Sequence, residues 1–309
     1  MWAVRKCLLN KGFVVDQRHY RCGNFFARLR SVAHCVVDCS AALHSFNDEG
    51  VSLTALARRQ PVGNPIGGDT IVTIPRYPHP VGLCVEDPQA RRLRTAPLAN
   101  LFKVRLANTE ARRESASYLI QRRYAWRGYS VGEHAAKMPS RITIAAHDSD
   151  GIVGTVTVGL DSEDGLFIDG LYAEEANQLR AGGRRIAEFT KLAIDNNSHS
   201  KPLLAALFHI AYICARRIHR CTDLLIEVNP RHVAFYRRML GFEPFGELRG
   251  DPRVGAPALL LRMRLEEGEK EIERLGGKVE LAAETRSLYP YFFAPREEAL
   301  IERRLRTLG

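Results

Sequence analysis

EVNPRHVAFYRRMLGF, residues 227–242, carries the clearest fold signal in this sequence. It begins at the end of a short apolar run that favours a β-strand. Asn229 is a good N-cap, Pro230 suits the first turn of a helix, and Gly241 suits the position after a helix C-terminus. The pattern predicts a short helix between a strand and a returning segment, with Tyr236 on that helix.

The flanking segments alternate between the periodicities of strands and helices. We predict strands at 102–106, 142–146, 152–160, 185–194, 224–228 and 258–265, and helices at 109–127, 173–181, 202–218 and 230–240. The turn DSDG at 148–151 predicts a hairpin between the second and third strands. This order predicts an α/β (α+β layered) fold, with a mixed, twisted sheet and helices on both faces.

The sequence divides into three parts. Residues 1–100 have no sustained periodicity and contain clustered Pro and Gly, so we expect a flexible, largely disordered extension. Residues 101–265 form the layered domain. Residues 266–309 are expected to be a C-terminal extension whose aromatic segment and tail helix pack on the core. The Cys35/Cys39 pair has no metal-ligand spacing, and we expect no metal.

Composition sets outer limits on function. The 309 residues are 45% hydrophobic and 26% charged, which is typical of a globular protein. The sequence contains no apolar run long enough to span a membrane. Its seven cysteines suggest no disulfide framework, so we expect a cytoplasmic protein. A formal net charge of +10 suits an acidic protein partner, nucleic acid or an anionic membrane.

Several long motifs occur in one order: RRYAWRGY (122–129), GIVGTVTVGLD (151–161), GLFIDGLYAEEANQLRAGGRRIAEFTKLAID (165–195), LLAALFHIAYICARRIH (203–219) and residues 227–242. With them, residues 103–265 resemble the long-chain N-acyl amino acid synthases, of the N-acyl-tyrosine synthase type, in the GNAT acyltransferase superfamily. The Glu188-x-x-Lys191 step is similar to the Glu-x-x-Arg step of acyl-homoserine-lactone synthases. Those relatives draw acyl chains from a carrier protein.

One difference from ordinary GNAT acetyltransferases concerns the donor. Their glycine-rich loop cradles the coenzyme A pyrophosphate, whereas residues 195–202 here read DNNSHSKP and contain no glycine. A single phosphate can still bind a helix N-terminus. The resemblance therefore favours the phosphopantetheine of an acyl carrier protein, held by Ser198, Ser200 and Lys201. Backbone amides at Thr190, Lys191 and Leu192 would polarise the thioester carbonyl if a bulge exposes one of them. The expected carrier-docking residues are Arg184, Arg185, Arg216, Arg217 and Arg220.

The resemblance also implies roles in the chemistry. Glu188 is the candidate base, or else forms an ion pair with Lys191 or Arg185. Tyr236, aided by Asn229, is the candidate acid for the departing thiolate, or else fills the core. The acceptor-binding candidates are Asp169, Tyr172, Arg231 and His232, the first two having turn and cap roles as the alternative. Leu203, Leu207 and Phe208 line an acyl tunnel or else form close-packed core.

These expectations favour an N-acyltransferase. It would move a medium or long fatty acyl group from an acyl carrier protein thioester to the α-amino group of an amino acid, without a permanently bound cofactor. One alternative is an acetyl-CoA-dependent acetyltransferase. The other is a non-catalytic basic module that binds nucleic acid or a membrane through its arginines; we expect no nucleic-acid partner.

Overall fold

The computed structural model describes residues 68–75, 101–125, 140–195 and 200–308. The remaining parts of the predicted N-terminal extension, together with Ser198, Cys35 and Cys39, lie outside these ranges. Among the described helices, none is long and apolar enough to cross a bilayer.

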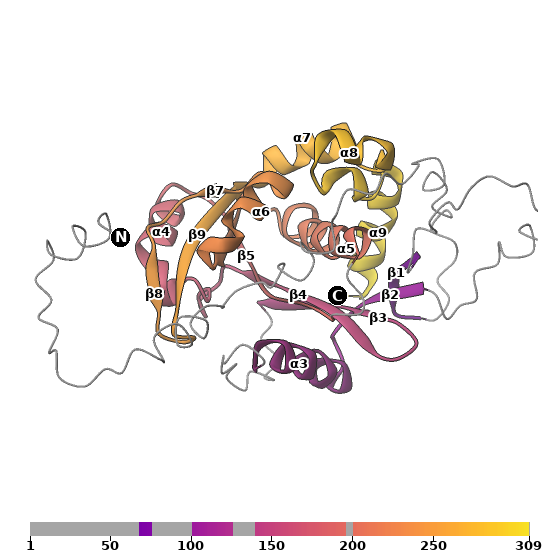
Figure 1. Cartoon of the computed structure of the whole chain (residues 1–309), viewed down its shortest axis with the longest axis horizontal. Coiled ribbons are helices and arrows are strands. Elements are labelled where there is room, and N and C mark those ends of the chain that lie inside the picture. Colours follow the sequence, from indigo (N-terminus) through magenta and orange to yellow (C-terminus); the bar gives the residue numbers. More distant parts are fainter. Residues whose placement is uncertain (1–67, 76–100, 126–139, 196–199, 309) are drawn as a thin grey trace, which may run out of the picture. The chain divides into compact units, whose positions relative to one another are not determined.

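A nine-stranded mixed sheet forms the centre of the described chain (Figure 1). Its strands are β1 (Thr70–Pro75), β2 (Leu101–Leu106), β3 (Arg141–His147), β4 (Ile152–Leu160), β5 (Ile186–Ile194), β6 (Asp223–Val228), β7 (Glu243–Pro244), β8 (Arg249–Asp251) and β9 (Ala256–Arg264). The order is β1-β2-β3-β4-β5-β6-β9-β7, and β8 pairs with β9. Among the described strands, only the β5–β6 pair is parallel. The predicted mixed sheet is therefore confirmed.

Helices cover both faces of the sheet. They are α3 (Glu110–Ala125), α4 (Asp169–Ala181), α5 (Lys201–Tyr212) with a π-helical end (Ile213–Ile218), α6 (Val233–Leu240), α7 (Leu265–Leu275), α8 (Ala282–Thr285) and α9 (Pro295–Leu308). Short 3₁₀ turns occupy Pro230–His232, Val279–Leu281 and Tyr289–Tyr291. Helices α3 and α4 pack on one face, and α5, α6, α7 and α9 pack on the other. Figure 1 shows α3 and α5 on opposite sides of the sheet.

The local signals at residues 227–242 fold as predicted. The Asn229 side chain accepts a hydrogen bond from the Arg231 amide at 3.3 Å and so caps the first turn. Gly241 ends α6 in the left-handed conformation, at φ 78°, which a glycine adopts without strain. The predicted 148–151 hairpin also forms between β3 and β4.

Two segments differ from the sequence-based expectation. Thr70–Pro75, within the region predicted to be largely disordered, form β1, which pairs with β2 and buries Ile71, Val72 and Ile74. Leu265–Leu275, where no element was predicted, form the amphipathic helix α7. Strand β1 was missed because a six-residue strand carries little periodicity of its own, and its partner lies some 30 residues later in the sequence.

The C-terminal segment packs on the face that carries α5. Phe292 and Phe293 stack on His209 of α5 with ring centroids 4.8 and 5.4 Å away. Ile301 and Leu305 of α9 are buried in the same core. These residues complete the hydrophobic core over α5, so this segment is part of the folded domain.

Candidate active site

Strands β5 and β6 separate in the middle of the sheet. Their pairing covers only three residue pairs and ends at Glu188–Leu225. Beyond this point β5 continues to Ile194 and β6 continues to Val228. Because the ladder stops while both strands continue, backbone groups on the two facing edges have no strand partner there. We call this region the β5–β6 opening.

A β-bulge interrupts β5 beside this opening. The β4–β5 register shifts between Thr155 and Thr157, and Lys191 adopts a positive φ of 52°. The Thr155 hydroxyl donates to the Lys191 carbonyl at 2.9 Å and holds the bulge in place. The predicted role of the Thr190–Leu192 amides in polarising a thioester carbonyl requires such a bulge, because a bulge frees a backbone amide from the strand pairing.

The bulge also changes which face of the sheet the last residues of β5 occupy. Leu192 and Ile194 join the α5-side core together with Phe189. A uniform alternation would have placed them on the side of Glu188. Burial is the leading cause that lowers the pKa of Lys191, whose ammonium lies 5.5 Å from the centroid of the Phe167 ring.

Glu188 lies at the last β5–β6 pair and is 0% exposed. Arg141, Gly159 and Glu188 occupy one row across β3, β4 and β5. A Cβ on Gly159 would lie 2.6 Å from the Glu188 side chain, so the glycine lets the two outer side chains meet over β4. Arg141 Nη1 donates to Glu188 Oε1 at 2.5 Å.

Two backbone amides complete the Glu188 site. The Phe167 and Ile168 amides donate to its carboxylate at 2.9 and 3.1 Å. The ion-pair partner is therefore Arg141, and the predicted pairing with Lys191 or Arg185 is wrong. The Glu188 carboxylate thus accepts three hydrogen bonds, one from a guanidinium group and two from backbone amides. It orders the loop before α4.

A second buried carboxylate lies on the same face of the sheet. Glu227 is 6% exposed and lies on β6 two residues beyond the last pair with β5. Its Oε2 accepts from Arg253 Nη2 at 2.6 Å. Arg253 also binds Asp251 and donates to the Phe167 carbonyl at 2.9 Å. Sequence reasoning missed Glu227 because it reads as one polar residue at a strand end.

The candidate acid Tyr236 lies on the opposite face. Its ring is fully buried and packs edge-on against Phe208, Phe235 and Phe242. Asn229 does not assist it through a free side chain. Its Oδ1 caps the Arg231 amide, and its Nδ2 donates to the Pro257 carbonyl at 3.3 Å. The expected helper role of Asn229 is thus replaced by a structural one.

The acceptor candidates are dispersed. Asp169 accepts from the Leu166 amide and from Arg180, so its carboxylate holds the turn that leads into α4. The Tyr172 hydroxyl donates to the carbonyls of Glu247 and Ala258 at 3.0 and 2.7 Å and joins α4 to the β8–β9 region. Arg231 and His232 lie together after β6, with Arg231 Nε donating to His232 Nε2 at 2.9 Å.

The donor candidates before α5 are only partly described. Ser200 is the N-cap of α5 and accepts from the Leu203 amide at 3.1 Å, so this hydroxyl is already used. Lys201 begins the helix. The tunnel candidates Leu203, Leu207 and Phe208 are all buried in the close-packed core on the α5 side, which matches the alternative interpretation.

The five arginines expected to dock a carrier divide into two groups. Arg216 binds Glu269, and Arg217 binds Glu269 and Glu298, so both guanidinium groups hold α7 and α9 against the π-helical turn. Their assignment to a free docking surface is corrected accordingly. Arg220 is exposed. Arg184 and Arg185 line a pocket of about 460 Å³.

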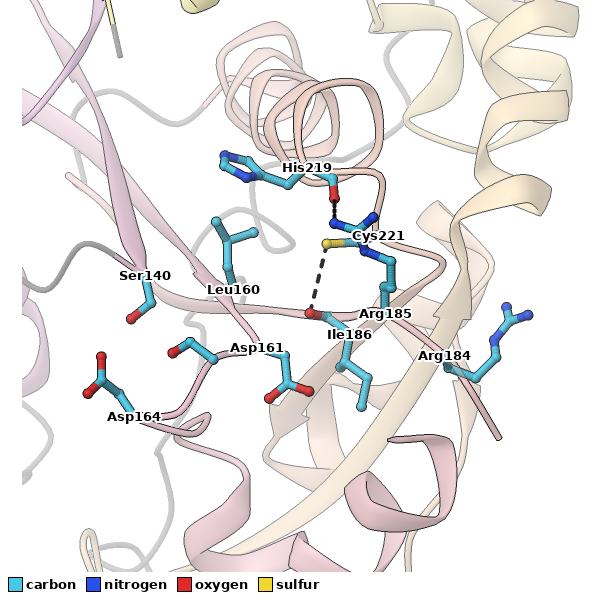
Figure 2. Close-up of a pocket in the computed structure, with 10 residues that line it drawn as sticks. Ser140, Leu160, Asp161, Asp164, Arg184, Arg185, Ile186, His219 and Cys221 are labelled. Carbon is cyan, nitrogen blue, oxygen red and sulfur yellow. Dashed lines mark hydrogen bonds between the residues drawn. The ribbon is translucent and has the colours of Figure 1, made fainter. Parts of the chain in front are cut away.

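That pocket lies at the other end of β5 from the opening (Figure 2). Its lining is mixed in charge, with Asp161 and Asp164 beside the arginines. Figure 2 marks the hydrogen bond from Arg185 to the His219 carbonyl, 2.7 Å long. Burial raises the pKa of the lining thiol Cys221 to about 11. Of the described residues predicted for acyl-transfer chemistry, none lines this pocket.

Comparison with known proteins identifies the domain. Residues 115–264 match the family model described as N-acyl amino acid synthase FeeM. The solved structure of FeeM, an N-acyl amino acid synthase from uncultured soil microbes, aligns with a TM-score of 0.52 and 27% identity, over 55% of this chain and 94% of that chain. This chain is an acyltransferase with a FeeM-like domain.

Two other solved structures align less well with the FeeM-like domain. A putative N-acetyltransferase from Lactobacillus plantarum is 14% identical over 53% of this chain and 98% of that chain, with a TM-score of 0.39. The AHL synthase LasI is 15% identical over 53% of this chain and 90% of that chain, with a TM-score of 0.36. No protein of curated function matches the chain.

Proposed function

We propose that this chain transfers a medium or long fatty acyl group from the phosphopantetheine thioester of an acyl carrier protein to the α-amino group of an amino acid. The observation that carries the proposal is the β5–β6 opening beside the Lys191 bulge, within a FeeM-like domain. An extended thioester arm can enter between two strand edges and bond to their backbone groups, as an added strand would.

The sequence before α5 supports this choice of donor. Residues 195–202 contain no glycine, the residue that most readily lets a backbone approach a diphosphate closely. A phosphopantetheine arm presents a single phosphate, which Lys201 and the N-terminus of α5 can neutralise. Arg220 and Arg185 are the remaining docking candidates for an acidic carrier protein, because Arg184 already forms an ion pair with the buried Asp223.

On this proposal the two faces of the sheet have different tasks. The acyl chain would displace or reorder side chains of the α5-side core, including Phe208, and Tyr236 would protonate the departing sulfur. The amino acid would approach from the α4 side, with Arg231 and His232 as candidates for binding its carboxylate. Glu188 would keep the loop before α4 in place.

A donor comparison tests the proposal. The full chain is incubated with a mixture of amino acids and either palmitoyl-carrier protein, palmitoyl-CoA or acetyl-CoA at equal concentration, and N-acyl products are identified by mass spectrometry. We expect N-palmitoyl amino acids, formed fastest from the carrier. Tyr236→Phe should slow turnover about 10²-fold or more.

Two results would contradict the proposal. Acetylated products from acetyl-CoA, with none from either palmitoyl donor, would identify an acetyltransferase instead. A complete lack of acyl products from all three donors, together with salt-sensitive DNA binding, would favour the non-catalytic module.

A further inference from the structure

Glu188 and Glu227 form a pair of carboxylates at the β5–β6 opening. Both point to the α4 side of the sheet, since Glu188 contacts the loop before α4 and Glu227 lies two residues after Leu225 of the α4-side core. The backbone of Phe167 joins them. Its amide donates to Glu188, and its carbonyl accepts from Arg253, which binds Glu227.

The two carboxylates differ in how many of their oxygens accept hydrogen bonds. Both oxygens of Glu188 accept hydrogen bonds. For Glu227, Oε2 accepts from Arg253, whereas Oε1 is buried and accepts no hydrogen bond from any described residue. A buried carboxylate oxygen that accepts no hydrogen bond raises the free energy of the charged form, so this arrangement favours protonation of Glu227.

The charges that face Glu227 come from three sides. Arg253 and Asp251 lie on the β8–β9 side, Glu188 lies on β5, and Tyr172 lies on α4. Arg253 forms ion pairs with both Glu227 and Asp251. The negative charges of Glu188 and Asp251 both disfavour a negative charge on Glu227. Burial is the main cause that raises the pKa of Glu227, to about 7, and the charges of Asp251 and Glu188 act in the same direction while Arg253 opposes the shift.

We propose that Glu227, rather than Glu188, takes the proton from the attacking amine. This inference rests on the proposed function. The α-ammonium group of the amino acid transfers one proton to Glu227 and becomes a neutral amine. Its nitrogen forms a bond to the thioester carbonyl carbon, the carbon–sulfur bond breaks, and the thiolate leaves. The nitrogen gives up a second proton as the amide forms, the thiolate is protonated, and Glu227 later releases its proton to water.

A pH profile of the wild-type chain and Glu227→Gln tests the proposal with palmitoyl-carrier protein and saturating amino acids. In the wild type, kcat should rise with pH through an inflection near the pKa of Glu227. Glu227→Gln should lower kcat about 10²–10³-fold and remove this inflection, with little change in the KM for the carrier. The matched control is Glu298→Gln. Glu298 is also a buried carboxylate, paired with Arg217 on the opposite face of the sheet, and its variant should keep the inflection.

A stability measurement provides a second readout that does not need substrate. A carboxyl group whose pKa is raised by folding stabilises the protein below its unfolded pKa and loses that contribution as pH rises through the folded value. Glu227→Gln should therefore unfold at a higher temperature than the wild type at pH 8, and this difference should close by pH 5. Arg253 keeps Asp251 as a partner in the variant.

Each outcome has a distinct meaning. If the wild type forms N-acyl products and Glu227→Gln retains the inflection, the inference fails while the proposed function stands. A lower kcat with the inflection retained would assign Glu227 a merely structural role, which also overturns the inference. If the wild type acylates no amine from any donor, the proposed function fails, and the inference fails with it.

Discussion

Gly159 shows how one residue without a side chain organises the charged centre of the sheet. Arg141 and Glu188 belong to strands that do not pair with each other, and β4 lies between them. The row passes through Gly159, so the carboxylate and guanidinium meet above the glycine. The Arg141 guanidinium also lies 3.8 Å from the centroid of the Phe167 ring, which adds a cation–π contact.

Gly159→Ala should therefore be destabilising. The new Cβ would lie 2.6 Å from the Glu188 carboxylate, and we expect a loss of about 1–3 kcal/mol in the free energy of unfolding, measured with urea. Gly250→Ala is the control, because nothing lies within 4 Å of its added Cβ. Equal stability of the two variants would show that Glu188 does not occupy the space above Gly159.

Glu298 should make the opposite pH-dependent contribution to that of Glu227. Burial alone would raise its pKa, but His209 and Arg217 outweigh burial and hold the pKa below its ordinary value. Such a group stabilises the fold above its unfolded pKa and loses that effect as pH falls through the folded value. Glu298→Gln should lose about 1–3 kcal/mol at pH 7, and the difference in unfolding free energy should shrink below about pH 4. A constant difference across this range would be inconsistent with an ionised Glu298.

At the scale of elements, the strongest sequence signals were those contained within one element. The hairpin and the cap of the 230–240 helix both follow from neighbours in sequence. The β5 facing and the partner of Glu188 did not follow, because they depend on a bulge and on residues far apart in sequence. Arg141 and Glu188 are separated by 47 positions, and Arg253 and Phe167 by 86.

We predict that strand β1 contributes to the stability of the core. Ile74 is 7% exposed in the core, whereas its neighbour Thr73 points to solvent. Ile74→Ala should cost about 2–4 kcal/mol of unfolding free energy, and Thr73→Ala should cost less than about 0.5 kcal/mol. Both are measured by urea unfolding of the full chain. Similar small effects at both positions would mean that β1 is not part of the cooperative core.

At the scale of the whole molecule, we propose a domain that extends from β1 to α9. It differs from the predicted 101–265 domain by including residues 68–75 and the C-terminal segment, both of which bury apolar side chains in the same core. Among the site predictions, Glu188, Lys191 and the bulge lie together at the opening. Asp169, Tyr172, Asn229 and Ser200 have structural roles, which sequence could not distinguish because caps and ligands use the same polar residue types.

The arginines should separate into two functional classes. Arg216→Glu places a negative charge beside Glu269 and should lower the unfolding free energy by about 1–3 kcal/mol. Arg220→Glu, at an exposed position, should leave stability unchanged within about 0.5 kcal/mol and raise the KM for the carrier severalfold, more so at low salt. An unchanged carrier KM in Arg220→Glu at low salt would remove this residue from the docking surface.

The most direct measurement is a crystal structure of the full chain with a non-hydrolysable palmitoyl-pantetheine thioether. We expect the pantetheine arm to lie between β5 and β6 beyond the Glu188–Leu225 pair, with the thioether sulfur near Tyr236 and the carbon that replaces the carbonyl near the Lys191 bulge. Electron density for the ligand only in the pocket of Arg184 and Arg185, with β5 and β6 unchanged, would contradict acyl transfer at the β5–β6 opening.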